Sequence, residues 1–439
     1  MRVAVATAMH TSGESFDRPG CYENTRVAVL KYLLDWISWK FEAETFIMWL
    51  YGDAGAGKSA IAQTLAMQCD AEKSLLASFF FSKNDPRRST DASFAATLVY
   101  QLLKAVPALK AIVSEIIEAD PLIFEQAPEI QISSLFVKPI NELLRHSSGS
   151  TPISLPHLII VDGLDECGNA ETQCRILKVL LNLCRQCDLP LKVLVACRPE
   201  VEITSSFNSD PLVSYSTRLA LDTRFKPEDD IRTFLTGHFE SIKATHPLKN
   251  HIPSSWPSND VVRTLVRRSS GQFIYASTIV KYFSSPRHKP TDRLEKVLGL
   301  RPLSSDRDLP FAVLDALYVH LLLSIPPENL EMVLKILGLI VIVQPVVGAY
   351  GAFDLRDLKW LSLFLSVDVD DIELYLVDLS SVIRWEQSST GPRVHVTHAS
   401  LSEFLLDSRR SQHLHIKQSL AFAEAAQITM RHIKSQTDG

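Results

Sequence analysis

Residues 52–59 read Gly-Asp-Ala-Gly-Ala-Gly-Lys-Ser and match the pattern G-x-x-x-x-G-K-[ST]. A loop of this kind wraps backbone N–H groups around phosphate oxygens, because its glycines adopt dihedral angles that a Cβ would obstruct. The apolar run 46–51 before the loop is typical of a buried strand, and apolar residues recur at helical spacing over 62–69. This order of strand, loop and helix predicts an α/β domain that binds a nucleotide.

The loop residues have separate predicted roles toward the phosphates. Lys58 supplies a positive charge for the β- and γ-phosphates, and Ser59 offers a hydroxyl to Mg²⁺. The helix that begins here adds the positive end of its dipole. A glycine-rich turn that arose by chance is the competing interpretation, and the flanking strand and helix argue against it. The predicted cofactor-binding residues of the loop are Gly52, Asp53, Ala54, Gly55, Ala56, Gly57, Lys58 and Ser59.

A second apolar run ends directly before an acidic stretch, residues 162–166. The carboxyl end of a strand is where parallel sheets bind ligands, so Asp162 is predicted to bind Mg²⁺ together with Ser59. Asp165 and Glu166 are the predicted catalytic residues, which would orient or deprotonate the attacking water. An acidic turn after a strand is common by itself, but beside a complete phosphate loop it favours this Walker B interpretation.

A third predicted strand, 191–197, ends at Arg198, whose side chain is a candidate sensor of the γ-phosphate. The alternative is a solvated arginine in a turn. Further strands are predicted at 77–81 and near 213–215. The basic run 83–88 that follows the first of these is interpreted as a solvated loop.

Together these motifs resemble those of the NACHT branch of the signal-transduction NTPases, which includes the NOD-like receptors. The loop, the acidic stretch and Arg198 look like the Walker A motif, the Walker B motif and the first sensor of that family. Gly163, a small residue followed by a further acidic pair, is similar to the feature that separates NACHT proteins from other P-loop proteins. The likeness is to fungal members in particular over residues 49–52, 158–167 and 269–276.

The resemblance runs from about Arg18 to about Asp407 and implies the fold class. That class is α/β: a P-loop NTPase with a parallel sheet, followed by an all-α helical domain and a winged-helix domain. The expected parts are a short N-terminal segment (1–24), the NACHT core (25–223), the helical domain and linker (224–306), a winged-helix-like domain (307–410) and a C-terminal tail (411–439).

His398 is the candidate functional residue of the expected winged-helix domain. It follows the alternating residues 394–397, which are typical of a strand, and precedes Ala399-Ser400. This stretch resembles the winged-helix histidine motif of the family, whose imidazole holds the β-phosphate in the ADP-locked state. The resemblance implies that His398 is a cofactor-binding latch. A histidine that caps or hydrogen-bonds locally at a strand-to-helix turn is the alternative.

Composition sets limits on partners and compartment. A net charge of −5, without a basic stripe interleaved with aromatics, predicts no nucleic-acid partner. Seven cysteines and no convincing secretory signal favour a reducing, cytoplasmic location. The apolar stretch 336–353 reaches only the lower limit for a membrane span and is interrupted by proline and glycine, so we expect a buried helix and turn there, and no membrane.

The leading hypothesis is a slow NTPase that acts as a switch, with ATP or ADP and Mg²⁺ as cofactors and the choice between ATP and GTP left open. ATP exchange would open the protein and allow homo-oligomerisation and binding of an unknown signalling partner, as the resemblance to innate-immunity-like receptors implies. The alternative is a non-catalytic scaffold protein in which a bound nucleotide has only a structural role. A metabolic P-loop kinase is disfavoured, because no acceptor-substrate site is evident. No effector domain or repeat array is evident either, so we expect a naturally short form or a piece of a longer protein.

Overall fold

The computed structural model describes residues 4–12, 20–40, 45–83, 85–146, 155–299, 312–342, 346–348, 351–379, 381–388, 391–396, 398–420 and 422–423 of the 439-residue chain. The chain divides into two compact units, Met1–Pro227 and Glu228–Gly439, called here the first unit and the second unit. The finer division into an NTPase core, a helical domain and a winged-helix domain stays a prediction.

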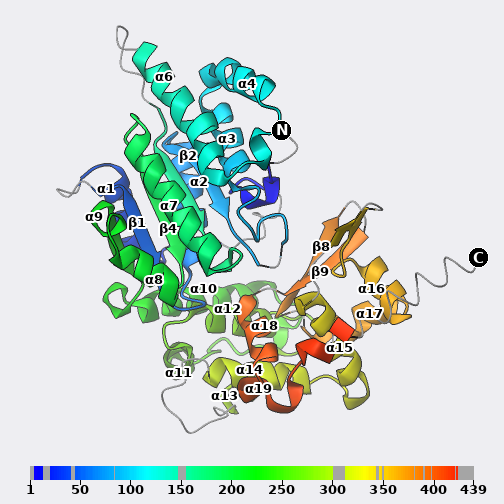
Figure 1. Ribbon diagram of the computed structural model, residues 1–439. Helices are drawn as coiled ribbons and strands as arrows, with labels where there is room; N and C mark the ends of the chain where they lie inside the picture. The colour runs from blue at the N-terminus through cyan, green and yellow to red at the C-terminus, as the bar shows by residue number, and fades with distance from the viewer. Residues whose placement is uncertain are drawn as a thin grey trace, which may run out of the picture. The chain divides into compact units, whose positions relative to one another are not determined.

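The first unit is built on a parallel sheet of five strands in the order β2-β3-β4-β1-β5 (Figure 1). Its apolar strands are almost entirely buried, as expected where helices cover both faces of a sheet. Because β4 lies between β3 and β1, the carboxyl ends of these three strands meet at one edge of the sheet. The strands are β1 (Ile47–Tyr51), β2 (Leu75–Phe80), β3 (Leu158–Asp162), β4 (Lys192–Cys197) and β5 (Ser216–Ala220).

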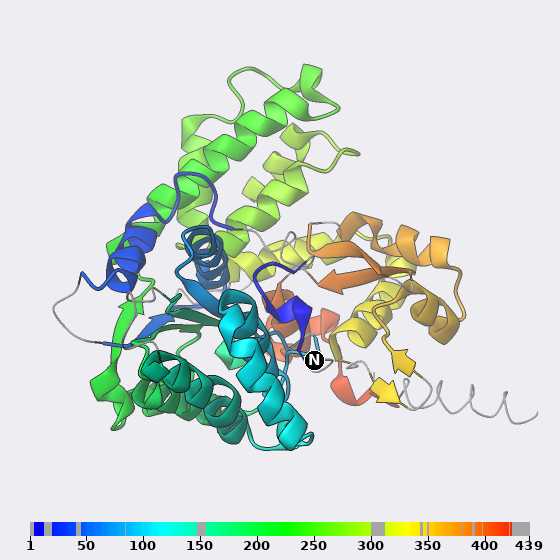
Figure 2. The ribbon, with the colours of Figure 1, turned by 90° about the horizontal axis from the view of Figure 1, so that it is seen from above.

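Helices pack on both faces of this sheet (Figures 1 and 2). On one face, Met48 and Leu50 of β1 pack in a core with helix residues such as Leu65. On the other face, the ring of Trp49 stacks on that of Phe207 with centroids 4.4 Å apart. The first face is covered by α1 (Val27–Ile37) and α2 (Lys58–Ala71). The second is covered by α3 (Phe94–Ala105), α5 (Pro128–Ile132), the π-helical turn Ser133–Val137, α6 (Lys138–His146), α7 (Ala170–Gln186) and α8 (Val201–Asn208), with α4 (Lys110–Ala119) and α9 (Leu212–Tyr215) near them in the chain.

Strand β2 stands at one end of the strand order, and a side chain occupies part of its outer edge. The carboxamide of Gln101 donates from Nε2 to the carbonyl oxygen of Ser78 (2.8 Å) and accepts from its N–H (3.0 Å). The N–H of His10 donates to Ser78 Oγ (3.1 Å), and Gln63 Nε2 donates to the carbonyl oxygen of His10 (3.0 Å). The backbone groups of Ser78 that face away from β3 are thereby satisfied without another strand.

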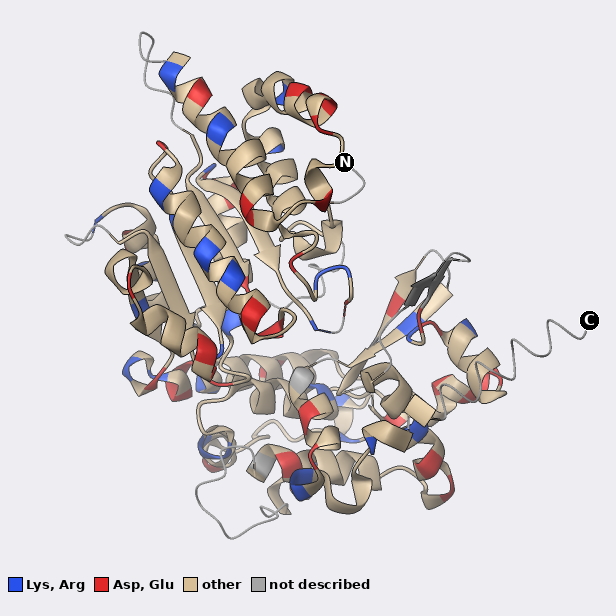
Figure 3. Ribbon diagram, in the orientation of Figure 1, with Lys and Arg blue, Asp and Glu red and all other residues tan. Residues whose placement is uncertain are grey.

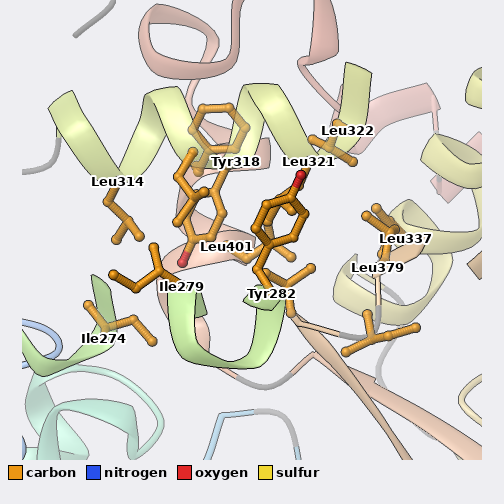
Figure 4. Packing of buried hydrophobic residues seen from close by; sticks show 14 of the residues in the cluster. Ile274, Ile279, Tyr282, Leu314, Tyr318, Leu321, Leu322, Leu337, Leu379 and Leu401 are labelled. Atoms are coloured by element: carbon orange, nitrogen blue, oxygen red, sulfur yellow. The ribbon is translucent and has the colours of Figure 1, made fainter. Parts of the chain in front are cut away.

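The second unit is mainly helical and contains two antiparallel hairpins. Its buried core runs from Ile231 to Ile416, and Figure 4 shows part of it, where Tyr318 projects beside Ile279 and Leu401. The helices are α10 (Pro227–Thr245), α11 (Asn259–Ser269), α12 (Phe273–Phe283), α13 (Pro290–Gly299), α14 (Ala312–Leu323), α15 (Pro327–Ile342), α16 (Leu358–Leu365), α17 (Val369–Leu376), α18 (Ala399–Leu406) and α19 (Ser408–Ser411). The hairpins are β6 (Val346–Gly348) with β7 (Gly351–Phe353) and β8 (Ile383–Ser388) with β9 (Gly391–Val396).

Two local expectations differ from the structure. Residues 213–215 belong to helix α9 rather than to a strand, and β5 begins only at Ser216; Pro211, directly before α9, suits the start of a helix. The stretch 284–310 is rich in proline and charged residues, which is typical of a linker, but it contains helix α13, which begins at Pro290 and buries Leu294 and Val297. The rest of that stretch, from residue 300, lies outside the described residues.

The apolar stretch 336–353 includes 343–345 and 349–350, which lie outside the described residues. Helix α15 accounts for its first part and ends at Ile342. Among the residues that the structure describes, no single helix is long and apolar enough to cross a membrane, and α3 with Pro107–Ala119 reaches that length only as a pair bent by 116°. The expected C-terminal tail likewise extends into the undescribed residues 424–439.

Candidate nucleotide-binding site

The loop 52–57 joins β1 to α2, and two of its glycines adopt left-handed conformations. Gly55 has φ 76°, and Gly57, which precedes the first residue of α2, has φ 90°. A Cβ on Gly57 would meet no atom within 4 Å, so its dihedral angle and not the space around it requires glycine. The loop therefore has the backbone conformation that turns N–H groups toward an anion.

The side chain of Lys58 donates hydrogen bonds to the phosphate loop that precedes it. Its Nζ donates to the carbonyl oxygens of Gly52 (2.7 Å) and Asp53 (2.9 Å). Burial lowers the pKa of Lys58, while the nearby carboxylates of Asp165 and Asp162 raise it. The ammonium group thus already lies over the loop that would hold the phosphates.

A buried arginine that we did not predict as a site residue holds the phosphate loop through a hydrogen bond. Arg26 precedes α1 with φ 56°, is 4% exposed, and donates from Nη2 to the carbonyl oxygen of Ala56 (2.8 Å). A lone arginine before a helix carries no sequence signal for such a contact, because Arg26 and Ala56 meet only through the packing of α1 beside the loop.

Asp162 is the last residue of β3 and is 4% exposed. Burial raises the pKa of the Asp162 carboxyl to about 7; a hydrogen bond with Ser59 opposes this, and the charges of Glu166 and Asp165 add to it. Its Oδ1 has no hydrogen-bond partner among the described residues. A buried carboxylate oxygen with no partner, beside a serine hydroxyl, fits the oxygen ligands that Mg²⁺ prefers.

Asp165 and Arg198 are brought together at the carboxyl ends of β3 and β4. Asp165 Oδ1 accepts from the backbone N–H of Arg198 (3.1 Å), and its Oδ2 lies 3.3 Å from Arg198 Nε. The Asp165 side chain is 7% exposed and that of Arg198 is 24% exposed. Arg198 is therefore paired with a carboxylate of the site and is not a solvated turn residue.

Glu166 ends the 3₁₀ turn Leu164–Glu166 and is held by the loop after β2. Its Oε2 accepts from the backbone N–H of Lys83 (3.2 Å). Burial and the charge of Asp165 raise the pKa of Glu166, while Lys83 and Arg198 lower it. A carboxylate with a raised pKa, whose charge also acts on Asp162, has the property expected of a proton acceptor.

We had interpreted the loop after β2 as a solvated basic run, but one of its arginines is buried and hydrogen-bonded. Arg88 is only 8% exposed and donates to the carbonyl oxygen of Phe80 (3.2 Å) and to Asp85 Oδ2 (3.2 Å). Arg87 also pairs with Asp85, whose pKa is lowered by these two arginines against the effect of burial. The interpretation was wrong for Arg88, because the carboxylate of Asp85 within the run neutralises its charge, whereas the Arg87 side chain is 52% exposed.

Gly163 connects Asp162 to the acidic turn and has a steric reason to be glycine. Its φ is 71°, and a Cβ would lie 3.0 Å from the carbonyl oxygen of Phe81. We expect Gly163→Ala to destabilise the protein by about 2 kcal/mol, because the left-handed conformation and the close oxygen both act against a methyl group. Chemical denaturation measures this. Gly299→Ala is the matched control, since a Cβ there meets no atom within 4 Å, and an equal loss in both variants would contradict the prediction.

His398 lies in the second unit at the start of α18. Its Nδ1 accepts from the backbone N–H of Ser400 (3.1 Å) and is 2.9 Å from Ser400 Oγ. The local capping that we weighed as the alternative to a latch is thus present. This hydrogen bond occupies Nδ1 of His398, and the role of His398 as a nucleotide latch stays a prediction.

Three comparisons bear on the chain. Residues 33–198, less than half of the chain, match the family model described as Nephrocystin 3, N-terminal; the match includes the phosphate loop, the acidic turn and Arg198. No curated protein matches the sequence.

Solved structures similar to this chain include a Walker-type ATPase of Pyrococcus abyssi, with 12% identity, 88% of this chain and 97% of that chain covered, and a TM-score of 0.40. The ORC2 protein of Aeropyrum pernix, in ADPNP and ADP complexes, has 12% identity, 97% and 99% coverage and a TM-score of 0.39. Drosophila ORC bound to DNA has 14% identity, 90% and 97% coverage and a TM-score of 0.36. Likenesses this distant carry no argument about function.

Our expectation that the chain has no nucleic-acid partner gains no support from these comparisons and stays a prediction. Figure 3 shows basic bands along α7, where Arg175, Lys178 and Arg185 are three and seven positions apart. One of them, Arg175, pairs with Asp91 at 3.2 Å.

The strand order places the phosphate loop, between β1 and α2, at the same edge of the sheet as the acidic end of β3. The family-model match includes all the motifs of this site. The first unit has the α/β fold of a nucleotide-binding P-loop NTPase.

Proposed function

We propose that the chain binds ATP and ADP with Mg²⁺, hydrolyses ATP slowly and works as a nucleotide-dependent switch. One observation carries the proposal: Asp162, whose buried Oδ1 has no hydrogen-bond partner within the described part of the chain, lies within hydrogen-bonding reach of Ser59, the residue that follows the lysine of the phosphate loop. This is the arrangement that a magnesium-bound nucleotide needs. The comparisons give no support for GTP.

Each residue of the site has a role in the proposal. Lys58 and the loop N–H groups would bind the phosphates, and Asp162 and Ser59 would hold Mg²⁺, whose positive charge would stabilise the phosphate oxygens. Glu166 accepts a proton from the attacking water. Asp165, whose two oxygens are engaged by Arg198, positions that arginine as the sensor of the γ-phosphate.

The switch itself is proposed from the resemblance to NACHT proteins. ADP held by the phosphate loop and by His398 would keep a closed state, and ATP would favour an open state that oligomerises and binds a signalling partner in a response to non-self. Nearly complete switching requires about 5.5 kcal/mol of difference in nucleotide affinity between the two states.

The test is to identify nucleotide retained by the purified chain, by chromatography after denaturation. We expect ADP in the wild type and its loss from His398→Ala. His415→Ala is the control, because His415 also contributes a half-buried ring to the second unit, with Nε2 3.2 Å from the carbonyl oxygen of Leu406. A wild type that is empty and does not bind added ATP would contradict the proposal and favour the scaffold.

Protonation of Asp162 gives a second test. Its pKa is about 7 in the folded chain, against a reference value of 3.8, so the folded state binds more protons between these values. This group's contribution to stability therefore falls as the pH rises from about 4 to about 7, when no Mg²⁺ is bound. Mg²⁺ binds the ionised carboxylate, so binding of Mg-ATP at pH 6 should release about one proton.

Isothermal titration calorimetry in buffers of different ionisation enthalpy measures this proton release. We expect Asp162→Asn to abolish it and Asp91→Asn, at a carboxylate already paired with Arg175, to leave it unchanged. Equal release by the wild type and by Asp162→Asn would exclude Asp162 as the group that loses the proton.

A further inference from the structure

The loop after β2 is attached to the acidic turn of the first unit at two points. The backbone N–H of Lys83 donates to Glu166 Oε2 (3.2 Å), as described above. Beyond the turn, the backbone N–H of Gly168 donates to the carbonyl oxygen of Ser89 (2.7 Å). The direction in which the Lys83 N–H points toward Glu166 therefore depends on the conformation of this loop.

The buried carboxylate of Asp85 holds this loop together from within. Asp85 is 4% exposed. Its Oδ1 accepts from the backbone N–H (3.1 Å) and the Nε (3.0 Å) of Arg87, and its Oδ2 accepts from Arg88 Nε (3.2 Å) and from the Thr7 hydroxyl (3.1 Å). Burial acts to raise the pKa of Asp85, but the hydrogen bonds and charges of the two arginines outweigh it and lower the pKa. Asp85 is thus an ionised group around which the loop is folded.

The two arginines that pair with Asp85 differ in their burial, and Arg88 also reaches the sheet. Its Nη1 donates to the carbonyl oxygen of Phe80, the last residue of β2 (3.2 Å), and its own carbonyl oxygen accepts the N–H of Ser82 (3.1 Å). The Arg88 side chain is 10% exposed, against 52% for Arg87. An exposed ion pair contributes little, whereas breaking a buried one is costly. Arg88 is therefore the side chain that connects Asp85, and with it the loop, to the end of β2.

We infer that Asp85 and Arg88 are positioning residues for Glu166, and that they fix the loop so that the Lys83 N–H holds Glu166 Oε2 and sets the direction of the carboxylate. The inference rests on the proposed function for the role of Glu166 as proton acceptor. A proton acceptor must lie within hydrogen-bonding reach of the attacking water, so a carboxylate that rotates away acts more slowly. The phosphates would bind at a different loop, 52–59. Loss of the positioning pair should therefore lower the rate of hydrolysis and leave the affinity for ATP unchanged.

The test compares Arg88→Met with Arg87→Met in the full chain. Methionine keeps an apolar side chain of similar length, and in Arg88→Met the carboxylate of Asp85 still has Arg87 as a partner. We expect Arg88→Met to lower the single-turnover rate constant of ATP hydrolysis about tenfold, as for the loss of one hydrogen bond to a charged group, with the dissociation constant for ATP within about twofold of the wild type. Arg87→Met, the matched control, should change neither. Partial unfolding would lower the amplitude of the single turnover and not its rate constant.

A double-mutant cycle shows whether the effect passes through Glu166. In the Glu166→Gln background, Arg88→Met should cause no further fall in the rate constant, because no proton acceptor remains to be positioned. The same tenfold fall with and without Glu166 would show that Arg88 acts elsewhere and would overturn the inference. A weaker affinity for ATP with an unchanged rate constant would overturn it as well.

The failure of the proposed function can be told apart from the failure of the inference. A wild type that does not bind or hydrolyse ATP contradicts the proposed function, and the positioning roles are then decided by hydrogen exchange of the Lys83 amide, which needs no nucleotide. We expect slow exchange in the wild type and in Arg87→Met, and exchange about tenfold faster in Arg88→Met and in Glu166→Ala, which lacks the acceptor. Unchanged exchange of this amide in Arg88→Met would overturn the inference.

Discussion

Replacing Lys58 with Ala should weaken the binding of ATP and ADP by about 100-fold, because it removes a charged hydrogen bond to the phosphates. The ammonium group donates to the carbonyl oxygens of Gly52 and Asp53, which places its charge at the loop that would hold the phosphates.

Isothermal titration calorimetry with ATP and with ADP measures the loss. Lys178→Ala is the matched control, because Lys178 is an exposed lysine in the middle of α7. Thermal unfolding without nucleotide shows how much of the effect comes from the two carbonyl oxygens left without the ammonium group. Unchanged affinity in Lys58→Ala would mean that the nucleotide does not bind at this loop.

Replacing Glu166 with Gln should slow ATP hydrolysis by roughly 100-fold or more, because the variant cannot accept a proton from the attacking water. The side-chain oxygen of glutamine can still accept the N–H of Lys83, which Glu166 Oε2 now accepts at 3.2 Å. The turn should therefore keep its conformation, and the affinity for ATP should stay within about twofold of the wild type.

Phosphate release under single-turnover conditions measures this rate. Glu171→Gln is the control, since Glu171 lies in the first turn of α7 with its side chain 84% exposed. A full rate in Glu166→Gln, together with a strong loss in Asp165→Asn, would reverse the two roles. Asp165 would then have to leave Arg198 during the reaction, because both of its oxygens now contact that residue.

The P-loop fold was predictable because its signals are local. A buried strand, a glycine-rich loop and a helix follow one another within 25 residues, from Ile47 to Ala71, and the structure confirms this order. The acidic end of β3 was recognisable for the same reason. Strand and helix bounds differed by a few residues, except at 213–215, where three residues carry too little pattern to separate a strand from a helical turn.

Contacts between segments that are far apart in the chain could not be predicted from the sequence. Arg26 meets Ala56, and Gly163 meets Phe81, only after the elements that carry them have packed. The resemblance gave a reason to note Gly163, but the reason that it is glycine came from the carbonyl oxygen facing it. The Tyr318 hydroxyl and Ser400 Oγ, 2.7 Å apart, belong to residues 82 positions apart in the chain, and no periodicity in the sequence reveals the contact.

The carboxamide of Gln101 limits how copies of this protein can assemble. At the edge of β2 it engages the N–H and the carbonyl oxygen of Ser78, the groups that an added strand would need for a backbone ladder. A second copy could not extend the sheet at this position without first displacing that side chain. If the active form is an oligomer, its subunits must therefore meet through helices, loops or the other edge of the sheet, and growth into an open β-structured aggregate is disfavoured at this edge.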